Sequence, residues 1–203
     1  MTEVAAVLLA AGAASRYRAA GGVEASKLVA DFRGVPLVRA AASAALSSQA
    51  RPLIVVTGHA CEKIEAALSG LDATFVHNPD YASGLSSSIK AGVAALPESA
   101  SGALILLGDM PRVSAKLLDR LIAAFAERPE ALAVIPVFGG ERGNPALLSR
   151  ALFAEVATLA GDEGARRLLR QADPRRIVEV ELDDDAIALD VDTPEDLEKA
   201  RRL

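Results

Sequence analysis

The sequence predicts an α/β fold with a doubly wound, mostly parallel β-sheet and helices on both faces. Three short apolar runs, Val4–Leu9, Leu53–Thr57 and Ala103–Leu107, have the composition of strands buried on both sides of a parallel sheet. Segments with helical character separate these runs. Because the chain has 203 residues, 51% of them hydrophobic, it can build one sizeable core. We therefore expect a single domain over residues 1–203.

The other expected elements continue this alternation along the chain. Further strands are expected at Ala73–His77, Ala131–Phe138 and Ile187–Val191. Helices are expected at Pro36–Leu46, Cys61–Leu68, Ser86–Leu96 and Ser114–Glu127, and a last helix is expected to begin at Pro194. In such a sheet, ligands bind beyond the carboxyl ends of the strands, so the loops at those ends are the candidates for a site.

Charge and composition restrict the partners. The net charge is −5, so no basic field attracts the chain to nucleic acid or to an anionic membrane, and we expect neither as a partner. The single cysteine, Cys61, excludes an internal disulfide and suits a reducing compartment. The first apolar run is too short to span a bilayer and no basic segment precedes it, so we expect a cytoplasmic protein.

The loop after the first strand is the first candidate site. Ala10 to Ser15 contains only alanine, glycine and serine, so a ligand can approach the backbone closely. A loop of this kind can turn its N–H groups toward a phosphate, and the cations Arg16 and Lys27 could flank the same pocket. The alternative is a plain strand-to-loop turn followed by two solvated basic residues.

A polar segment, Asn78 to Ser88, leads into the helix expected at Ser86–Leu96. Its three consecutive serines could simply cap that helix. The same geometry would also offer hydroxyls and free N–H groups to a ligand, which we favour over capping alone. Further along, Asp162 is interpreted as a possible N-cap and is not predicted to bind a ligand.

Acidic residues follow two of the expected strands. Asp109 lies at the exit of a central strand, where a carboxylate is costly unless it is solvated, paired or bound to a cation. Magnesium usually takes one or two carboxylates together with substrate phosphates and water, so Asp109 needs a partner. Asp190 and Asp192 precede the last helix and could be merely an acidic turn. Asp183–Asp185 is interpreted as a solvated turn.

These segments together resemble a known family. Leu9-Ala10-Ala11-Gly12, with Ser15-Arg16 and Lys27, resembles the signature of the MobA-like nucleotidyltransferases, and of their molybdenum cofactor cytidylyltransferase branch in particular. Gly108-Asp109-Met110-Pro111 and the segment from Asp190 to Leu197 are similar to the family's two acidic motifs. The resemblance runs from Val4 to Leu203 and implies a Rossmann-like nucleotidyltransferase fold. One departure is that Arg16 and Lys27 are 11 positions apart, a longer gap than the family usually has.

The resemblance implies roles for individual residues. The nucleotide-binding residues that it implies are Leu9, Ala10, Ala11, Gly12, Ala13, Ser15, Asn78, Gly84, Ser87 and Ser88. The implied catalytic residues are Arg16, Lys27 and Asp109. It also implies Mg²⁺ as the cofactor, held by Asp109 and Asp192, with Asp190 as the alternative to Asp192.

The implied reaction is transfer of CMP from CTP, or of the nucleotide of another NTP, to a terminal phosphate of the acceptor, with release of pyrophosphate. The implied acceptor is molybdopterin or its molybdenum-loaded form, and a molybdenum hydroxylase could receive the product. Two alternatives remain open: a cytidylyltransferase for a sugar or polyol phosphate, and a nucleotide- or cofactor-binding maturation factor without turnover. The sequence lacks Gly-x-Gly-x-x-Gly after the first strand and lacks a Walker pattern, which argues against a dehydrogenase and a P-loop kinase.

Overall fold

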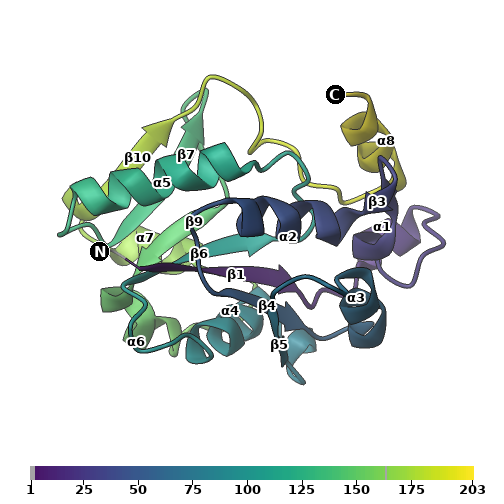
Figure 1. Cartoon of the computed structure of the whole chain (residues 1–203), viewed down its shortest axis with the longest axis horizontal. Helices are drawn as coiled ribbons and strands as arrows, with labels where there is room; N and C mark the ends of the chain where they lie inside the picture. Colours follow the sequence, from purple (N-terminus) through teal and green to yellow (C-terminus); the bar gives the residue numbers. More distant parts are fainter. Residues whose placement is uncertain (1–2, 163) are drawn as a thin grey trace.

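The computed structural model describes residues 3–162 and 164–203, and it confirms the predicted fold class. An eight-stranded, mostly parallel sheet has the strand order β10-β7-β9-β6-β1-β4-β5, with β8 paired to β7. Helices cover both faces of this sheet (Figure 1). β9 runs antiparallel to both β6 and β7, and β8 runs antiparallel to β7. The antiparallel pairs therefore all lie on the β6 side of β1.

The bounds of the elements are close to those expected for most of the chain. The strands of the main sheet are β1 Val4–Ala10, β4 Leu53–Thr57, β5 Thr74–His77, β6 Gly102–Leu107, β7 Ala133–Phe138, β8 Glu141–Arg142, β9 Ala146–Ser149 and β10 Ile177–Glu181. A separate hairpin pairs β2 Asp31–Phe32 with β3 Val35–Pro36. The helices are α1 Ser15–Ala19, α2 Leu37–Ser47, α3 Cys61–Ala67, α4 Leu85–Ala94, α5 Ala115–Glu127, α6 Phe153–Val156, α7 Arg166–Gln171 and α8 Pro194–Arg202.

The sheet separates two apolar cores because side chains alternate between its faces. On β1, Leu8 packs into the core beneath α2, α5 and α8, whereas Val7 packs into the core beneath α4, α6 and α7. α4 approaches β1 closely: a Cβ at Gly92 would lie 2.3 Å from the Cγ1 atom of Val7. Small residues therefore let this helix lie directly against the central strand.

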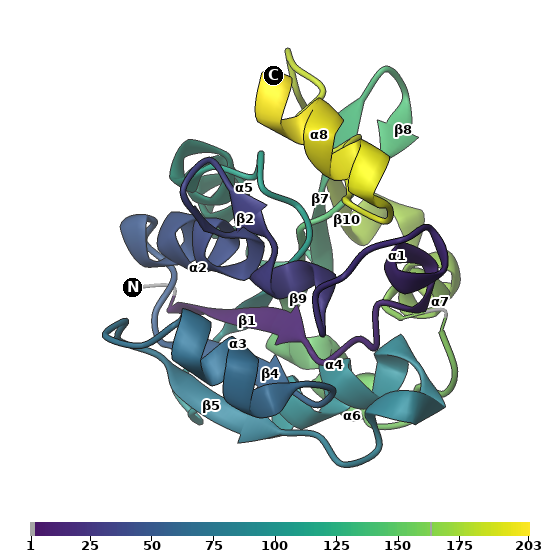
Figure 2. The same ribbon diagram turned by 90° about the vertical axis from the view of Figure 1, so that its right-hand side faces the viewer.

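The topology defines where a ligand can bind. From β1 the chain proceeds to β4 and β5 on one side, and then returns to place β6 on the other side of β1. The strand order therefore reverses between β1 and β6, and a crevice opens at such a switch point beyond the carboxyl ends of the strands. Figure 2 shows α1 at the end of the molecule toward which β1 runs.

Two expectations from the sequence need correction. Ile187–Val191 is not a strand, although Ile187, Leu189 and Val191 alternate as buried residues, because no neighbouring strand pairs with it among the described residues. The edge strand of this region is instead β10, which pairs in parallel with β7. The loop expected at Ala10 to Ser15 is one residue shorter at each end, since β1 includes Ala10 and α1 begins at Ser15.

None of the helices in the described part of the chain has the length and apolar character needed to cross a membrane.

Candidate active site

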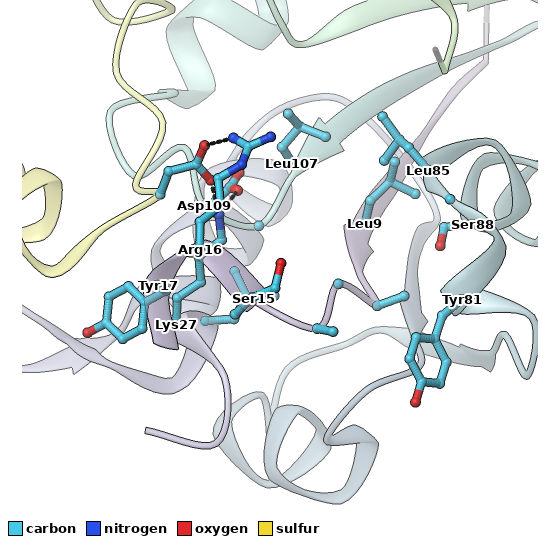
Figure 3. A pocket seen from close by; sticks show the side chains of 18 of the residues that line it. Leu9, Ser15, Arg16, Tyr17, Lys27, Tyr81, Leu85, Ser88, Leu107 and Asp109 are labelled. Carbon is cyan, nitrogen blue, oxygen red and sulfur yellow. Dashed lines mark hydrogen bonds and ion pairs between the residues drawn. The ribbon is translucent and has the colours of Figure 1, made fainter. Parts of the chain in front are cut away.

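A cavity of about 520 Å³ lies at the switch point, beyond the carboxyl ends of β1 and β6. Figure 3 shows Arg16, Lys27 and Asp109 at one end of this pocket and Leu85, Ser88 and Tyr81 at the other, with Ser15 between them. The predicted site residues that line it are Leu9, Ala11, Gly12, Ala13, Ser15, Arg16, Lys27, Gly84, Ser88, Asp109 and Asp192. It also contains Ala14, Tyr17, Leu28, Tyr81, Ala82, Leu85, Leu107, Gly108 and Asp162.

The first loop lies along the floor of the pocket. Ala10 is the last residue of β1 and is buried at 1% exposure, so it supports the loop without lining the cavity. The chain then turns at Ala14, whose φ of 52° is in the left-handed region, and enters α1. No described side chain caps the first turn of α1. Ala13, Ala14 and Ser15 line the cavity with small side chains only, which leaves room for a ligand to approach the backbone here.

Lys27 links the two acidic segments. Its Nζ atom lies 2.7 Å from Oδ2 of Asp109 and 2.7 Å from Oδ1 of Asp192. Arg16, which is largely exposed, forms a second ion pair with Asp192. Lys27 begins a 3₁₀ turn, and the buried side chain of Ser26 caps this turn by accepting a hydrogen bond from the Leu28 amide. The structure thus brings together the cations and acids that the sequence predicted, from segments far apart in the chain.

Two local interactions place Asp192 at the pocket. The amide of Val191, a fully buried residue, donates to the carbonyl of Asp109 at 3.0 Å and joins the two acidic segments directly. On the other side, the Asp196 carboxylate accepts from the amides of Asp192 and Thr193 in the capping box of α8. Asp190 is exposed and does not line the pocket, so of the two candidates it is Asp192 that faces Asp109.

The ion pairs shift the ionisation of this cluster. Burial opposes the charge on Lys27, but attraction to Asp109 and Asp192 outweighs it and raises the pKa of the ammonium above its usual value. Burial likewise opposes the charge on Asp192, yet Lys27 and Arg16 hold the pKa of that carboxyl below its usual value. Both groups are therefore charged at neutral pH.

The carboxylates of Asp109 and Asp192 fit a magnesium ion whose remaining ligands would be substrate phosphates and water. The Oδ1 atom of Asp109 is buried and has no hydrogen-bond partner among the described residues, so one carboxylate oxygen remains free to bind a cation. The described residues contain no cluster of three or more His, Cys, Asp or Glu side chains placed to bind a metal. Two carboxylates plus phosphate and water ligands are what Mg²⁺ usually takes.

The polar end of the pocket is organised differently. The Asn78 side chain is buried and donates to the hydroxyls of Ser87, at 2.8 Å, and Ser88, at 3.1 Å. Ser87 in turn donates to the carbonyls of Asp80 and Gly84. Asn78 and Ser87 do not line the cavity, whereas Ser88 does. The serines do not cap α4, because the N-cap residue is Gly84 and no hydroxyl bonds to the first amides.

Asp162 supplies the cap that the serines do not. Its Oδ1 atom accepts from the Leu85 amide at 3.2 Å, and the Gly161 carbonyl accepts from the Ser86 amide at 3.0 Å. Gly84 has a φ of 109°, and a Cβ there would lie 2.6 Å from the Asp162 carboxylate, so only glycine fits. Asp162 was expected as a possible N-cap of the short helix that follows it, but the N-cap of α7 is Ala165, and Asp162 instead accepts from the first amide of α4.

The structure adds residues to the site that the sequence did not indicate. Tyr17 and Tyr81 line the pocket from α1 and from the turn before α4. Tyr17 immediately follows Arg16. An aromatic residue at that position, in a chain with only 3% aromatic residues, is the sequence feature that could have indicated Tyr17 as a site residue. Leu85, the first residue of α4, is 36% exposed and lines the cavity.

Comparison with known proteins identifies the family. The sequence profile of the family described as the MobA-like NTP transferase domain matches residues 6–177, which is most of the chain. This chain belongs to the MobA-like NTP transferase domain family. It is therefore a nucleotidyltransferase of the MobA-like kind. The matched range contains the first loop, Lys27 and Asp109, but it ends before Asp192, so the placement of Asp192 rests on the structure.

Several relatives of this MobA-like domain extend the comparison. A protein of Escherichia coli named molybdenum cofactor cytidylyltransferase is 29% identical over 150 residues, covering 73% of each chain. A protein of Paenarthrobacter nicotinovorans named nicotine blue oxidoreductase is 31% identical over 198 residues, covering 94% of this chain and 93% of its own. The sequence relatives of this chain therefore carry names of more than one activity.

Solved structures give the same fold. A nucleotidyl transferase from Methanothermobacter thermautotrophicus superimposes with a TM-score of 0.84 and 29% identity, covering 100% of this chain and 97% of its own. A Mycobacterium tuberculosis protein whose crystal structure is a complex with manganese superimposes with a TM-score of 0.79 and 27% identity, covering 99% of both chains. These similarities confirm the Rossmann-like nucleotidyltransferase fold expected from the sequence.

Proposed function

We propose that this chain transfers CMP from CTP to the terminal phosphate of molybdopterin, or of its molybdenum-loaded form, and releases pyrophosphate. The observation that carries this proposal is the position of Lys27, 2.7 Å from both Asp109 and Asp192 beside an alanine- and glycine-rich loop at the switch point. This arrangement suits a triphosphate, because it combines backbone amides, two cations and two carboxylates in one cavity. The relative named molybdenum cofactor cytidylyltransferase supports the choice of acceptor.

The chain's own residues would act by position and charge. The amides from Ala11 to Ser15, together with Arg16, would hold the β- and γ-phosphates. Lys27 would stabilise the charge that develops at the α-phosphorus when an acceptor phosphate oxygen attacks it and pyrophosphate leaves. No protein nucleophile is needed, since the acceptor supplies the attacking oxygen. Catalysis would therefore depend on alignment of the two phosphates and on neutralisation of their charge.

Asp109 and Asp192 would hold Mg²⁺, through the free Oδ1 atom of Asp109 and the carboxylate of Asp192. When bound, such an ion would neutralise the phosphate oxygens of the NTP and of the acceptor. The structural relative in complex with manganese supports a divalent cation at a fold of this kind.

The test is a pyrophosphate-release assay with each of CTP, GTP, ATP and UTP, with and without molybdopterin and with and without Mg²⁺. The proposal expects release that requires both the acceptor and the metal, and that is fastest with CTP. Release with a sugar or polyol phosphate in place of molybdopterin would establish the other cytidylyltransferase function. Tight NTP binding without any pyrophosphate release would contradict an enzyme and favour a maturation factor.

A further inference from the structure

The connection between Arg16 and Lys27 contains a side-chain interaction that closes it into a compact loop. Tyr17 is only 2% exposed, although its neighbours Arg16 and Arg18 are exposed. The Tyr17 hydroxyl donates to Oε2 of Glu24 at 3.0 Å. Figure 3 shows Tyr17 at the end of the pocket where Arg16 and Lys27 lie. We call the interacting residues Tyr17, Gly22 and Glu24 the clasp.

Gly22 completes the clasp by letting the backbone approach the ring. A Cβ at Gly22 would lie 2.1 Å from the Cδ1 and Cε1 atoms of Tyr17, so no other residue fits without movement of the ring. The Gly22 amide also donates to the Tyr17 carbonyl at 3.0 Å. The turn of the chain after α1 is thus built around one aromatic side chain.

The clasp connects at both ends to groups of the charged cluster. Arg16 directly precedes Tyr17 on α1, and Lys27 follows Glu24 by three residues. Between them, His59 contacts the Ala25 carbonyl through its Nε2 atom at 3.2 Å, and Ser26 caps the turn that carries Lys27. The loop is therefore fixed to the body of the protein next to Lys27 and to itself next to Arg16.

We propose that Tyr17 and Glu24 are positioning residues for nucleotidyl transfer: their hydrogen bond sets where α1 presents Arg16 and where the loop delivers Lys27 to Asp109 and Asp192. This inference rests on the proposed function for its effect on turnover, but the clasp itself can be measured without turnover. Burial and the hydrogen bond to Glu24 raise the pKa of Tyr17 to about 12, so the hydroxyl remains a donor at neutral pH.

The test compares Tyr17→Phe and Glu24→Gln with Val23→Ala. Val23 lies in the same loop but is 92% exposed, so its truncation removes no contact of the clasp. Tyr17→Phe, which removes the donor, is expected to lower kcat/KM for the NTP about tenfold. Glu24→Gln keeps an acceptor oxygen but removes its charge, so it is expected to have a smaller effect in the same direction, and the double variant is expected to lose no more than Tyr17→Phe alone. Val23→Ala is expected to match the wild type.

A second comparison shows whether Tyr17 acts through Arg16. Calorimetric NTP binding is measured for Tyr17→Phe with Arg16 intact and again in an Arg16→Ala background. The proposal expects the loss of affinity caused by Tyr17→Phe to shrink to less than about twofold in that background. An equal loss in both backgrounds overturns the proposal, as does a lower melting temperature with unchanged kcat and KM.

Hydrogen exchange of the amides in residues 16–27 separates this inference from the proposed function. Faster exchange in Tyr17→Phe and Glu24→Gln, and wild-type exchange in Val23→Ala, is expected whether or not the enzyme turns over. Wild-type exchange in the first two variants overturns the clasp even in an active enzyme. If the wild type releases no pyrophosphate, the proposed function is wrong. If exchange is nevertheless faster in the two variants, the clasp still orders the loop.

Discussion

The two ends of the pocket are both polar, but their polar groups are satisfied in different ways. At one end, Arg16, Lys27, Asp109 and Asp192 form ion pairs across segments that are distant in the chain. At the other end, Ser88 lines the cavity and accepts from the side chain of Asn78, which lies outside the lining and also donates to Ser87, so these polar groups are satisfied within one segment. Figure 3 shows that the labelled residues of the two ends face each other across Ser15.

This difference indicates which end can change its partners when a ligand binds. An ion pair at a partly exposed cavity wall can exchange its partner for a phosphate or a metal at modest cost, because the charges remain neutralised. A buried amide that loses its hydrogen-bond partners pays the full desolvation penalty. We therefore expect the charged end to act on the substrate, and the end at Asn78 to hold the shape of the wall.

Asp109→Ala is expected to lower pyrophosphate release about 10³-fold. The loss is large because this change removes both the proposed metal ligand and a partner of Lys27. The fold should remain, since Lys27 keeps its pair with Asp192. Steady-state release and a thermal melt measure the two effects. The matched control is Asp185→Ala, which removes an ion pair with Arg112 away from this pocket. Wild-type turnover by the Asp109 variant would exclude the mechanism.

Lys27→Ala is expected to lower kcat about 10²-fold and to change KM for the NTP much less, because the lysine would stabilise charge that develops in the transition state. Arg16→Ala should weaken NTP binding as well. Full saturation curves for both variants provide the comparison, and Lys116→Ala on the exposed face of α5 is the control for loss of a lysine. If Lys27→Ala changes KM alone, the lysine binds the ground state and the longer loop has displaced it from the reacting phosphate.

Asn78→Ala is expected to lower the free energy of unfolding by about 1–3 kcal/mol, because the hydroxyls of Ser87 and Ser88 lose a buried donor. Urea denaturation followed by circular dichroism measures this change. KM for the NTP should change less than threefold in the folded variant, about 0.6 kcal/mol. Unchanged stability together with much weaker NTP binding would mean that Asn78 serves the nucleotide directly.

Ala11→Gly is expected to give a smaller change, an increase of up to about tenfold in GTP use relative to CTP. The methyl group of Ala11 lies at the cavity wall, and a single methyl in a pocket discriminates by about 1–3 kcal/mol at most. A Cβ at Gly58 would lie 2.9 Å from the Cβ of Ala11, so the wall is tightly packed on that side. Turnover with both nucleotides at equal concentration gives the ratio. Ala14→Gly, which also adds flexibility to the loop, should leave the ratio unchanged.

The sequence predicted the sheet and the charged end of the pocket well. Long apolar runs identify buried parallel strands, and the switch point then determines which loops lie together. The family resemblance implied that Lys27, Asp109 and Asp192 lie together, and the 2.7 Å distances from Lys27 to both carboxylates show that they do. Their roles in binding a metal and in turnover remain predictions.

What the sequence did not predict depends on contacts that have no periodic signal. The alternation at Ile187–Val191 is genuine, but it buries side chains against the body of the protein without a strand partner. β10 was missed because its alternating glutamates place it at a half-exposed sheet edge. The clasp was missed for a similar reason, since a contact between Tyr17 and Glu24 depends on the path of an irregular loop.

The low aromatic content has a practical consequence for the study of this pocket. The chain contains no Trp and two Tyr, and both tyrosines, Tyr17 and Tyr81, line the cavity. Its tyrosine fluorescence therefore arises from the walls of one site, where Figure 3 places the two rings at opposite ends. Tyr81→Phe would leave a reporter beside the cations, and Tyr17→Phe would leave one beside α4. Titration with pyrophosphate, which does not absorb in this range, could then locate a bound phosphate group without any label.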